Sequence, residues 1–361
     1  KKSPFWEKWF KTQFGRVKKD HLVFFSRQLS TLIKAGVPIL MALESLIEQT
    51  EQPALSRALE TIRYDVESGK NFSEALRAHP DVFPSLYVNT IVAGETGGVL
   101  PKVLDRLTEI LDHEYETESN IKAALRYPMF VLLALVGAFL FLVTVVVPQF
   151  ISMFARLGGE LPWMTKVLIQ INALIRDHWV VMIIAVISMI FAVKMFLSTQ
   201  RGQRTFDYAK MKIPVIGPLL LKLYISRFSH MLGMLLDSGM PILRALGNVA
   251  PSVGNVIIEE EINKIESSVR EGEGFAGPLK GSPYFPPMVS TMARVGEASG
   301  QISEMLLEIA RHYDRDIKYT VAHLTKLIEP LVITLLAAMV LFFALGIFLP
   351  MWDYYNLLVR G

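Results

Sequence analysis

The 361-residue chain contains no cysteine, and its charges almost balance. The absence of cysteine excludes a disulfide and a thiolate metal site. With 37 Lys and Arg against 34 Asp and Glu, the formal net charge is only +3, which argues against a dedicated nucleic-acid-binding protein. No segment alternates apolar and polar residues with a period of two, so we expect no sheet and predict an all-α fold.

Sequence motifs for catalysis are also missing. There is no Walker A motif, and the G-x-G-x-x-G match at 272–277 follows a helical segment where a phosphate cradle needs a preceding strand. No acid, base or metal set converges in the sequence, so we expect no enzyme and no cofactor. A secondary transporter needs polar groups at mid-membrane, but the first and third apolar segments offer only Thr144 and Thr334. A transporter and a membrane-bound enzyme are therefore the weaker alternatives.

What the chain does have is a stretch present twice. Residues 25–43 recur 203 positions later as residues 228–246, with ten of nineteen positions identical. Each copy has leucines at helical spacing, followed by Gly, one residue, and Pro-Ile-Leu. Glycine closes a helix in the left-handed conformation and proline suits the beginning of the next one, so the stretch predicts helix, corner, helix. The corner residues are Gly36 and Pro38, then Gly239 and Pro241.

The duplication extends beyond this corner. After a one-residue deletion the offset becomes 202, and a Gly-Glu-x-x-Gly sequence recurs with it. A unit of roughly 125 residues and a following apolar segment have been copied. The two interpretations of the Gly-Glu-x-x-Gly loops are compatible: a helix end whose glutamate favours the positive end of the next helix dipole, or a loop that contacts a partner. Their residues are Gly94, Glu95, Gly98, Gly296, Glu297 and Gly300.

Three apolar segments predict membrane spans. The composition is 52% hydrophobic, with a mean hydropathy of +0.37. Residues 129–147 and 331–349 carry no charge, and residues 180–197 carry only Lys194 near one end, where its ammonium group can snorkel. At about 1.5 Å per residue, each segment is about 28 Å long, close to the roughly 30 Å hydrocarbon layer. The first apolar run begins past residue 128, so we expect no signal peptide.

Lys and Arg near the membrane ends predict the orientation. Three spans place both copies on one side, and that side has more basic residues within about 20 positions of the spans, which is typical of the cytoplasm. Four basic residues lie on the other side, Arg156, Lys166, Arg176 and Arg360, against ten with the copies: Lys122, Arg126, Arg201, Arg204, Lys210, Lys212, Arg311, Arg315, Lys318 and Lys326. We therefore expect a cytoplasmic N-terminus and a periplasmic C-terminus.

These observations predict the domain organisation. We expect two homologous cytoplasmic six-helix-bundle domains and three transmembrane helices. The predicted segments are a basic aromatic N-terminal segment (1–20), the first domain (21–127), the first span (128–148), a periplasmic loop (149–178), the second span (179–198), the second domain (199–329), the third span (330–350) and a short periplasmic tail (351–361).

Three local patterns remain, and two of them have two interpretations each. Residues 1–20 place aromatics on one helical face among lysines, as in a helix on an anionic membrane surface, or form a lead-in packed on the first domain. Asn71 and Glu74 have the spacing of a capping box at a helix start. The acidic residues Glu109, Asp112 and Glu116 are a weak calcium candidate, with a solvated acidic helix face as the favoured alternative.

The combination of both corner motifs, the Gly-Glu-x-x-Gly loops, Arg126-Tyr127-Pro128 before the first span and an unpaired middle span resembles a known family. It is similar to the inner-membrane platform proteins of type IV pilus and type II secretion machines, from about residue 21 onward. The resemblance implies a non-enzymatic adaptor that couples a cytoplasmic hexameric assembly or retraction ATPase to pilin or pseudopilin subunits. It also implies contacts with membrane lipid and with other inner-membrane assembly proteins, and a homo-oligomer such as a dimer.

Overall fold

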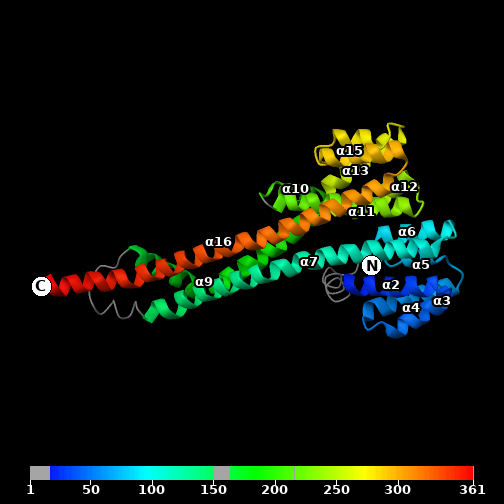
Figure 1. Cartoon of the computed structure of the whole chain (residues 1–361). Helices are drawn as coiled ribbons and strands as arrows, with labels where there is room; N and C mark the ends of the chain where they lie inside the picture. Colours follow the sequence, from blue (N-terminus) through cyan, green and yellow to red (C-terminus); the bar gives the residue numbers. More distant parts are fainter. Residues whose placement is uncertain (1–16, 150–162, 215, 361) are drawn as a thin grey trace. The chain divides into compact units, whose positions relative to one another are not determined.

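The regular structure of the residues that the computed structural model describes is entirely helical (Figure 1). The model describes residues 17–149, 163–214 and 216–360, and within these ranges it has fourteen α-helices and no strand. The prediction of an all-α fold is confirmed for this part of the chain. Residues 1–16 of the predicted N-terminal segment and residues 150–162 of the predicted loop lie outside the described residues.

The first copy consists of five short helices and the beginning of a long one. Its core contains Phe25, Leu29, Leu43, Leu59 and Leu104, each no more than 2% exposed. These residues recur at helical spacing, so burying one face of each helix creates a single apolar core. The helices are α2 (Lys19–Lys34), α3 (Ile39–Gln49), α4 (Pro53–Glu67), α5 (Phe72–Arg77), α6 (Ser85–Thr96) and α7 (Leu100–Phe141).

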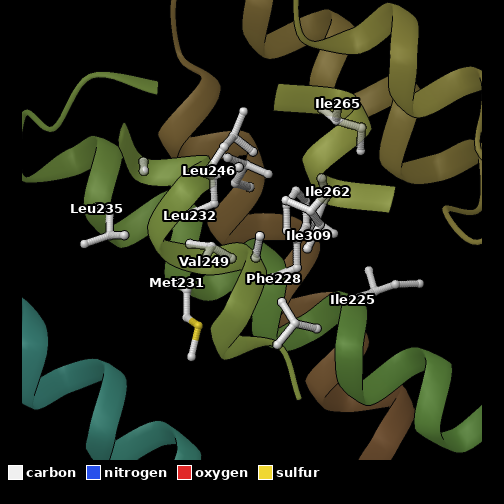
Figure 2. Close-up of a cluster of buried hydrophobic side chains, with 14 of the residues drawn as sticks. Ile225, Phe228, Met231, Leu232, Leu235, Leu246, Val249, Ile262, Ile265 and Ile309 are labelled. Carbon is white, nitrogen blue, oxygen red and sulfur yellow. The ribbon is translucent and has the colours of Figure 1, made fainter. Parts of the chain in front are cut away.

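The second copy repeats this order of helices. Figure 2 shows its core, where Phe228, Leu232, Leu246, Ile262 and Ile309 are completely buried. The repeated helices are α11 (Ile216–Asp237), α12 (Ile242–Val249), α13 (Val256–Arg270), α14 (Ala276–Gly281), α15 (Pro287–Ser299) and α16 (Ile302–Arg360), with a 3₁₀ turn at Ala250–Ser252. One further helix, α10 (Gln200–Lys212), precedes them.

The corner between the first two helices of each copy has the geometry of a left-handed helix end. Gly36 has φ 81° and Gly239 has φ 93°, values that residues with a side chain adopt only at a cost. The amide after each glycine reaches back to the preceding helix, with Val37 N donating to Leu32 O at 3.0 Å in the first copy. Pro38 and Pro241 each immediately precede the next helix.

The chain divides into two compact units, and both copies belong to the first. Unit 1 comprises the residues up to Ser119 together with Asp207–Lys318, and unit 2 comprises Asn120–Phe206 together with the residues from Tyr319 onward. Long helices pass from one unit into the other: α7 continues through Pro128 without ending, and α16 has 59 residues. The predicted boundaries between separate domains stay a prediction.

Unit 2 contains its own, smaller apolar cluster, in which Val143, Val147, Leu168 and Phe343 are buried. After α7 the chain forms a π-helical turn, η1 (Leu142–Val146), in which each N–H bonds five residues back instead of four. Helix α9 (Trp163–Leu197) is interrupted by non-helical dihedrals at His178, next to the predicted start of the second span.

Two buried polar side chains tie the helices of unit 2 together. Asn172 Nδ2 donates to Val143 O inside the π-helical turn at 2.7 Å, and Thr165 Oγ1 donates to Gly346 O at 2.7 Å. Gly346 permits this approach because a Cβ at that position would lie 2.5 Å from Leu168 Cδ1. Helix α9 is therefore hydrogen-bonded to both α16 and the end of the first apolar segment.

Four helices among the described residues are long and apolar enough to cross a membrane, one more than the three spans predicted from the sequence. Three contain the segments predicted as spans, and the fourth is Ile216–Asp237, which coincides with α11. In α11, 56% of the most apolar window is buried inside the structure, against 17%, 0% and 12% in the others. Many of its apolar residues belong to the core of the second copy, so its moderate hydropathy is that of a buried core helix.

Candidate functional site

The two Gly-Glu-x-x-Gly loops bind the beginning of a neighbouring short helix. Glu297, near the end of α15, accepts hydrogen bonds from Phe275 N at 2.8 Å and from Ala276 N at 3.2 Å, where α14 begins. Glu95, near the end of α6, accepts from Ser73 N at 3.3 Å through both of its oxygens, in the first turn of α5. A carboxylate at this position satisfies N–H groups that lack a partner in the helix and interacts favourably with the helix dipole.

The glycines of the same loops allow the helices to pack closely. A Cβ on Gly94 would lie 3.1 Å from Val103 Cβ, and a Cβ on Gly296 would lie 3.0 Å from Ile302 Cα. Gly98 and Gly300 have φ values of 64° and 72°, so they reverse the chain between the two helices. In both copies the motif thus brings one helix against the next and orients the glutamate toward a third.

The predicted capping box at residue 71 is wrong in one respect. Asn71 does precede α5, but its side chain makes no capping hydrogen bond. The carboxylate of Glu95, 22 residues away from Ser73, bonds the first turn instead. Spacing within a sequence detects only a local cap, whereas here the capping group comes from another helix.

The two copies share a single apolar interface. Leu86 and Ile110 of the first copy are 5% and 1% exposed and belong to the core cluster of the second copy. Across the same interface Asn89 Nδ2 donates to Asn248 Oδ1 at 2.9 Å. A surface cavity of about 680 Å³ lies beside this pair, and Asn89 and Asn248 both line it. Its other lining residues are Val92, Ala93, Thr96, Met240, Leu243, Arg244, Gly247, Glu266 and Arg270.

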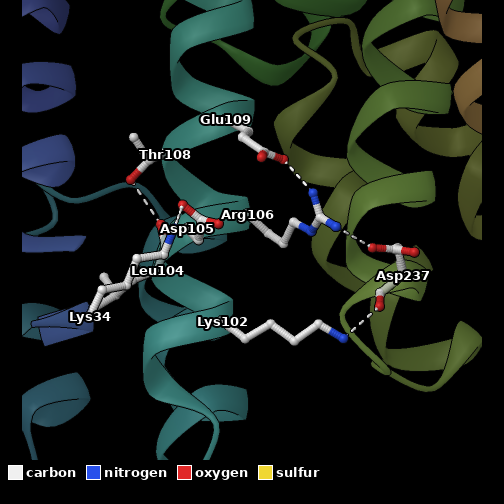
Figure 3. Close-up of polar contacts among 8 residues, drawn as sticks. All are labelled: Lys34, Lys102, Leu104, Asp105, Arg106, Thr108, Glu109 and Asp237. Atoms are coloured by element: carbon white, nitrogen blue, oxygen red, sulfur yellow. Dashed lines mark hydrogen bonds and ion pairs between the residues drawn. The ribbon is translucent and has the colours of Figure 1, made fainter. Parts of the chain in front are cut away.

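Charged groups continue this interface along α7. Figure 3 shows Arg106 of the first copy between Glu109 and Asp237, with 2.7 Å from its Nη2 to Asp237 Oδ2. Lys102 Nζ donates to the backbone oxygen of Asp237 at 3.1 Å. The glutamate and aspartate raise the pKa of Arg106 above its usual value, although partial burial opposes them. An arginine with two carboxylates and a lysine thus hold the C-terminal end of α11.

Two histidines stack where the copies meet. The rings of His113, from the first copy, and His230, from the second, are 4.0 Å apart and nearly parallel. His113 Nε2 lies 2.8 Å from Asp314 Oδ2, and Ser226 Oγ donates to the other oxygen of Asp314 at 2.5 Å. Burial, and then the neighbouring His113, lower the pKa of His230 to about 4. Burial acts to raise the pKa of Asp314, but the hydrogen bonds from His113 and Ser226 lower it overall.

Two of the three acidic residues considered for calcium form ion pairs with arginines. Asp112 Oδ1 lies 2.7 Å from Arg27 Nη2, and Glu109 Oε2 lies 2.7 Å from Arg106 Nη1. Within the residues that the structure describes, no three Asp, Glu or His side chains form a group suited to a metal ion. Calcium binding at Glu109, Asp112 and Glu116 stays an untested prediction.

Comparison with known proteins identifies the family. The family model described as "Type II secretion system (T2SS), protein F" matches residues 25–148 and again residues 228–350, which are the two copies found in the sequence. The chain belongs to this family. The recognition made from the corner motifs and the Gly-Glu-x-x-Gly loops is therefore confirmed.

Individual relatives agree over almost the whole chain. The chain is 39% identical to a type IV pilus assembly protein PilC of Thermus thermophilus over 92% of its own length and 82% of the relative. It is 34% identical to a PilC of Myxococcus xanthus (94% and 82%) and 29% identical to a type II secretion system protein F of Vibrio cholerae (94% and 84%). These are assembly and secretion-system proteins, and a non-enzymatic role is confirmed by this membership.

Sequence reasoning missed the residues at the interface of the copies. Arg106, His113, His230, Asp237 and Asp314 are ordinary charged or polar residues of amphipathic helices in the sequence. The only available signal is that they differ between the copies at equivalent positions: Arg27 corresponds to His230, and Lys34 corresponds to Asp237. Positions that diverge in charge on otherwise similar helices indicate faces with different surroundings.

We expect loss of the capping carboxylates to destabilise unit 1 unequally. Glu297→Ala should lower the free energy of unfolding by about 1–2 kcal/mol, because two helix N–H groups lose a charged acceptor. Glu95→Ala should cost less, since its hydrogen bonds are longer. Thermal unfolding of the purified full-length protein in detergent measures both, with Glu273→Ala as an exposed control. Equal loss in all three variants would contradict the capping role.

We expect the stability of unit 1 to fall on acidification because of His230. Above a pH of about 6.5 the imidazole is neutral in the folded and unfolded chain. Between pH about 6.5 and about 4 the unfolded chain binds a proton that the folded protein does not, so the free energy of unfolding decreases by up to about 3 kcal/mol. Thermal unfolding of the full-length protein between pH 7.5 and 4.5 measures the effect.

A matched pair of variants tests whether His230 causes this dependence of stability on pH. His230→Gln should flatten the dependence on pH, whereas His312→Gln, at another half-buried histidine of the second copy, should retain it. Curves of equal slope for the two variants would show that His230 does not cause the effect.

Proposed function

We propose that this protein is an inner-membrane platform protein of type IV pilus assembly, which couples a cytoplasmic ATPase to the insertion or removal of pilin. The observation that carries the proposal is the identity of 39% and 34% to two type IV pilus assembly proteins over more than nine-tenths of the chain. The equivalent role in a type II secretion system is the second candidate, supported by relatives at 29–31% identity.

The proposed arrangement in the membrane follows from the distribution of apolar and basic residues. The three spans are residues 128–148, 179–198 and 330–350, and both copies face the cytoplasm together with the N-terminus. The fourth apolar helix, α11, is assigned to the core of the second copy because more than half of its apolar window is already buried there. A helix whose apolar face is occupied by protein gains little from lipid.

The proposed mechanism is mechanical. A pilin enters or leaves the filament through an apolar segment, and lipid already solvates apolar groups, so its extraction depends on packing surfaces that change. Each copy is continuous with an apolar segment through an unbroken helix, α7 or α16. Helical continuity allows a displacement of a cytoplasmic domain by the ATPase to reach the segments that contact pilin. Gly36, Pro38, Gly239 and Pro241 would keep the bundles rigid, while Gly94, Gly98, Gly296 and Gly300 fix the packing of their helices.

Deletion of the gene distinguishes the two machines. We expect the deletion strain to lose surface pili, as seen by electron microscopy, and to retain secretion of folded exoproteins into the medium. Complementation with the wild-type gene is the control. Loss of secreted exoproteins with normal piliation would favour the secretion system instead, and no change in either would refute the platform role.

Single cysteines test the proposed orientation, because the natural chain has none. Tyr64→Cys and Ser267→Cys place a thiol at equivalent, exposed positions of the two copies, and Lys166→Cys places one in the proposed periplasmic segment. We expect a membrane-impermeant maleimide to label only Lys166→Cys in intact spheroplasts, and all three variants after lysis. Different labelling of Tyr64→Cys and Ser267→Cys in spheroplasts would place the copies on opposite sides and refute this topology.

A further inference from the structure

The two copies pack against each other through different faces. The first copy uses α6 and α7, with Asn89, Arg106 and His113, and we call this the α6–α7 face. The second copy contributes chiefly α11 and α12, with Asp237 and Asn248, and we call this the α11–α12 face. An interface between two similar bodies that uses unlike faces is heterologous.

A heterologous contact leaves one equivalent face of each body uncovered. The equivalents follow from the sequence offsets of 203 before the deletion and 202 after it. In the second copy the α15–α16 face is equivalent to the α6–α7 face, with Thr291 at the position of Asn89 and Glu308 at that of Arg106. In the first copy the α2–α3 face is equivalent to the α11–α12 face, with Lys34 at the position of Asp237.

Both equivalent faces expose apolar side chains in the structure. On the α2–α3 face, Phe24 is 55% exposed and Met41 is 60% exposed, and on the α15–α16 face Val295 is 50% exposed. Val295 is the equivalent of Ala93, which packs against the core of the second copy. The position of Val295, which is covered at the interface of the copies, is therefore open to another body on the outer face.

The charges on the outer faces are complementary to each other. Within the chain, Arg106 pairs with Asp237. At the equivalent positions of the outer faces both signs are reversed, with Glu308 opposite Lys34. A second contact, His113 with Asp314, becomes Arg315 with Asp112, so both equivalent pairs on the outer faces join opposite charges.

We propose that the α15–α16 face of one chain binds the α2–α3 face of a second copy of the same chain, in the arrangement that the two copies adopt within one chain. The outer faces are more polar than the inner ones, since Gln28 and Thr31 stand where the inner interface has Met231 and Met234. Contact between chains is therefore weaker than contact between copies. Lys34 keeps its present partner Asp105, Glu308 keeps Arg311 and Arg315, and each gains one more.

The mode of association has a geometric consequence. Every chain carries one face of each kind, so each bound chain presents a free face to the next one. The product is a ring if the rotation closes and an open array if it does not. A symmetric dimer, in which the same face of both chains meets itself, is a different arrangement. The inference does not depend on the pilus or secretion role.

Cysteine cross-linking of the full chain in membranes distinguishes these arrangements. Ser45 and Thr291 are equivalent to Asn248 and Asn89, whose side chains lie 2.9 Å apart. Two differently tagged chains, one with Ser45→Cys and one with Thr291→Cys, should give a disulfide-linked heterodimer when co-expressed and oxidised, and neither should cross-link when expressed alone. The chain with Asn89→Cys and Asn248→Cys is the positive control and should form an intrachain disulfide.

The alternative outcomes overturn the proposal. Cross-linking of Ser45→Cys with itself indicates a symmetric contact, and the absence of any heterodimer, with the positive control intact, indicates that the outer faces are merely solvated. A chain that carries both Ser45→Cys and Thr291→Cys should form a ladder of species larger than a dimer. If this chain gives only monomer after oxidation, the head-to-tail arrangement is contradicted.

Charge reversal tests the specific pair. Lys34→Glu or Glu308→Lys, added to the cross-linking chains, should reduce the heterodimer several-fold, and the two reversals on opposite partners should restore it. Lys70→Glu is the matched control, because Lys70 is similarly exposed and also has one aspartate partner in its own copy. An equal effect of Lys70→Glu, or no rescue by the double reversal, would refute this pairing.

Discussion

The structure of unit 1 depends on the burial of apolar side chains from one copy in the core of the other. Leu86 and Ile110 belong to the first copy, but their side chains are buried in the cluster around Phe228 and Leu232 of the second. Burying such side chains contributes about 1.5–3 kcal/mol each, which is large compared with the exposed ion pairs around them. The polar contacts, Asn89 with Asn248 and Arg106 with Asp237, fix the orientation of an association that the apolar residues drive.

Gene duplication explains why the two copies have the same frame and different surfaces. The left-handed glycines at the corners, the closely packed glycines before α7 and α16, and the capping glutamates are present in both copies. The differences are concentrated where the surroundings differ. Arg27 has an aspartate of its own copy as its partner, whereas its equivalent His230 stacks on a histidine from the other copy. The residues that set the helix packing are the same in both copies, and the residues on their surfaces differ.

Much of this fold was accessible from the sequence, for identifiable reasons. The repeat, the helical class and the apolar segments follow from periodicity and composition. Both properties can be read directly from the sequence. Glu95 and Glu297 were recognised as a motif, but the helix that each one caps lies about 22 residues earlier in the chain, so the contact depends on the fold. The apolar helix α11 was not counted among the candidate spans, because its hydropathy is moderate and its burial is visible only in three dimensions.

The interface between the copies was not predictable in the same way. A helix wheel separates an apolar face from a polar one, but it does not tell a face that packs on another body from one that water covers. Ile110 has the pattern of a residue in the core of its own bundle, yet it belongs to the neighbouring core. Only the comparison of equivalent positions in the two copies carried a trace of this difference.

The bond between Asn172 and the carbonyl of Val143 has a consequence for sliding motions in unit 2. A π-helical turn leaves a carbonyl that its own helix does not saturate, and an amide side chain from α9 supplies the missing donor. In a bilayer no water is present to replace that donor. A shift of the two segments by one residue along the helix axis would therefore separate the Asn172 amide from Val143 O and cost both groups this partner.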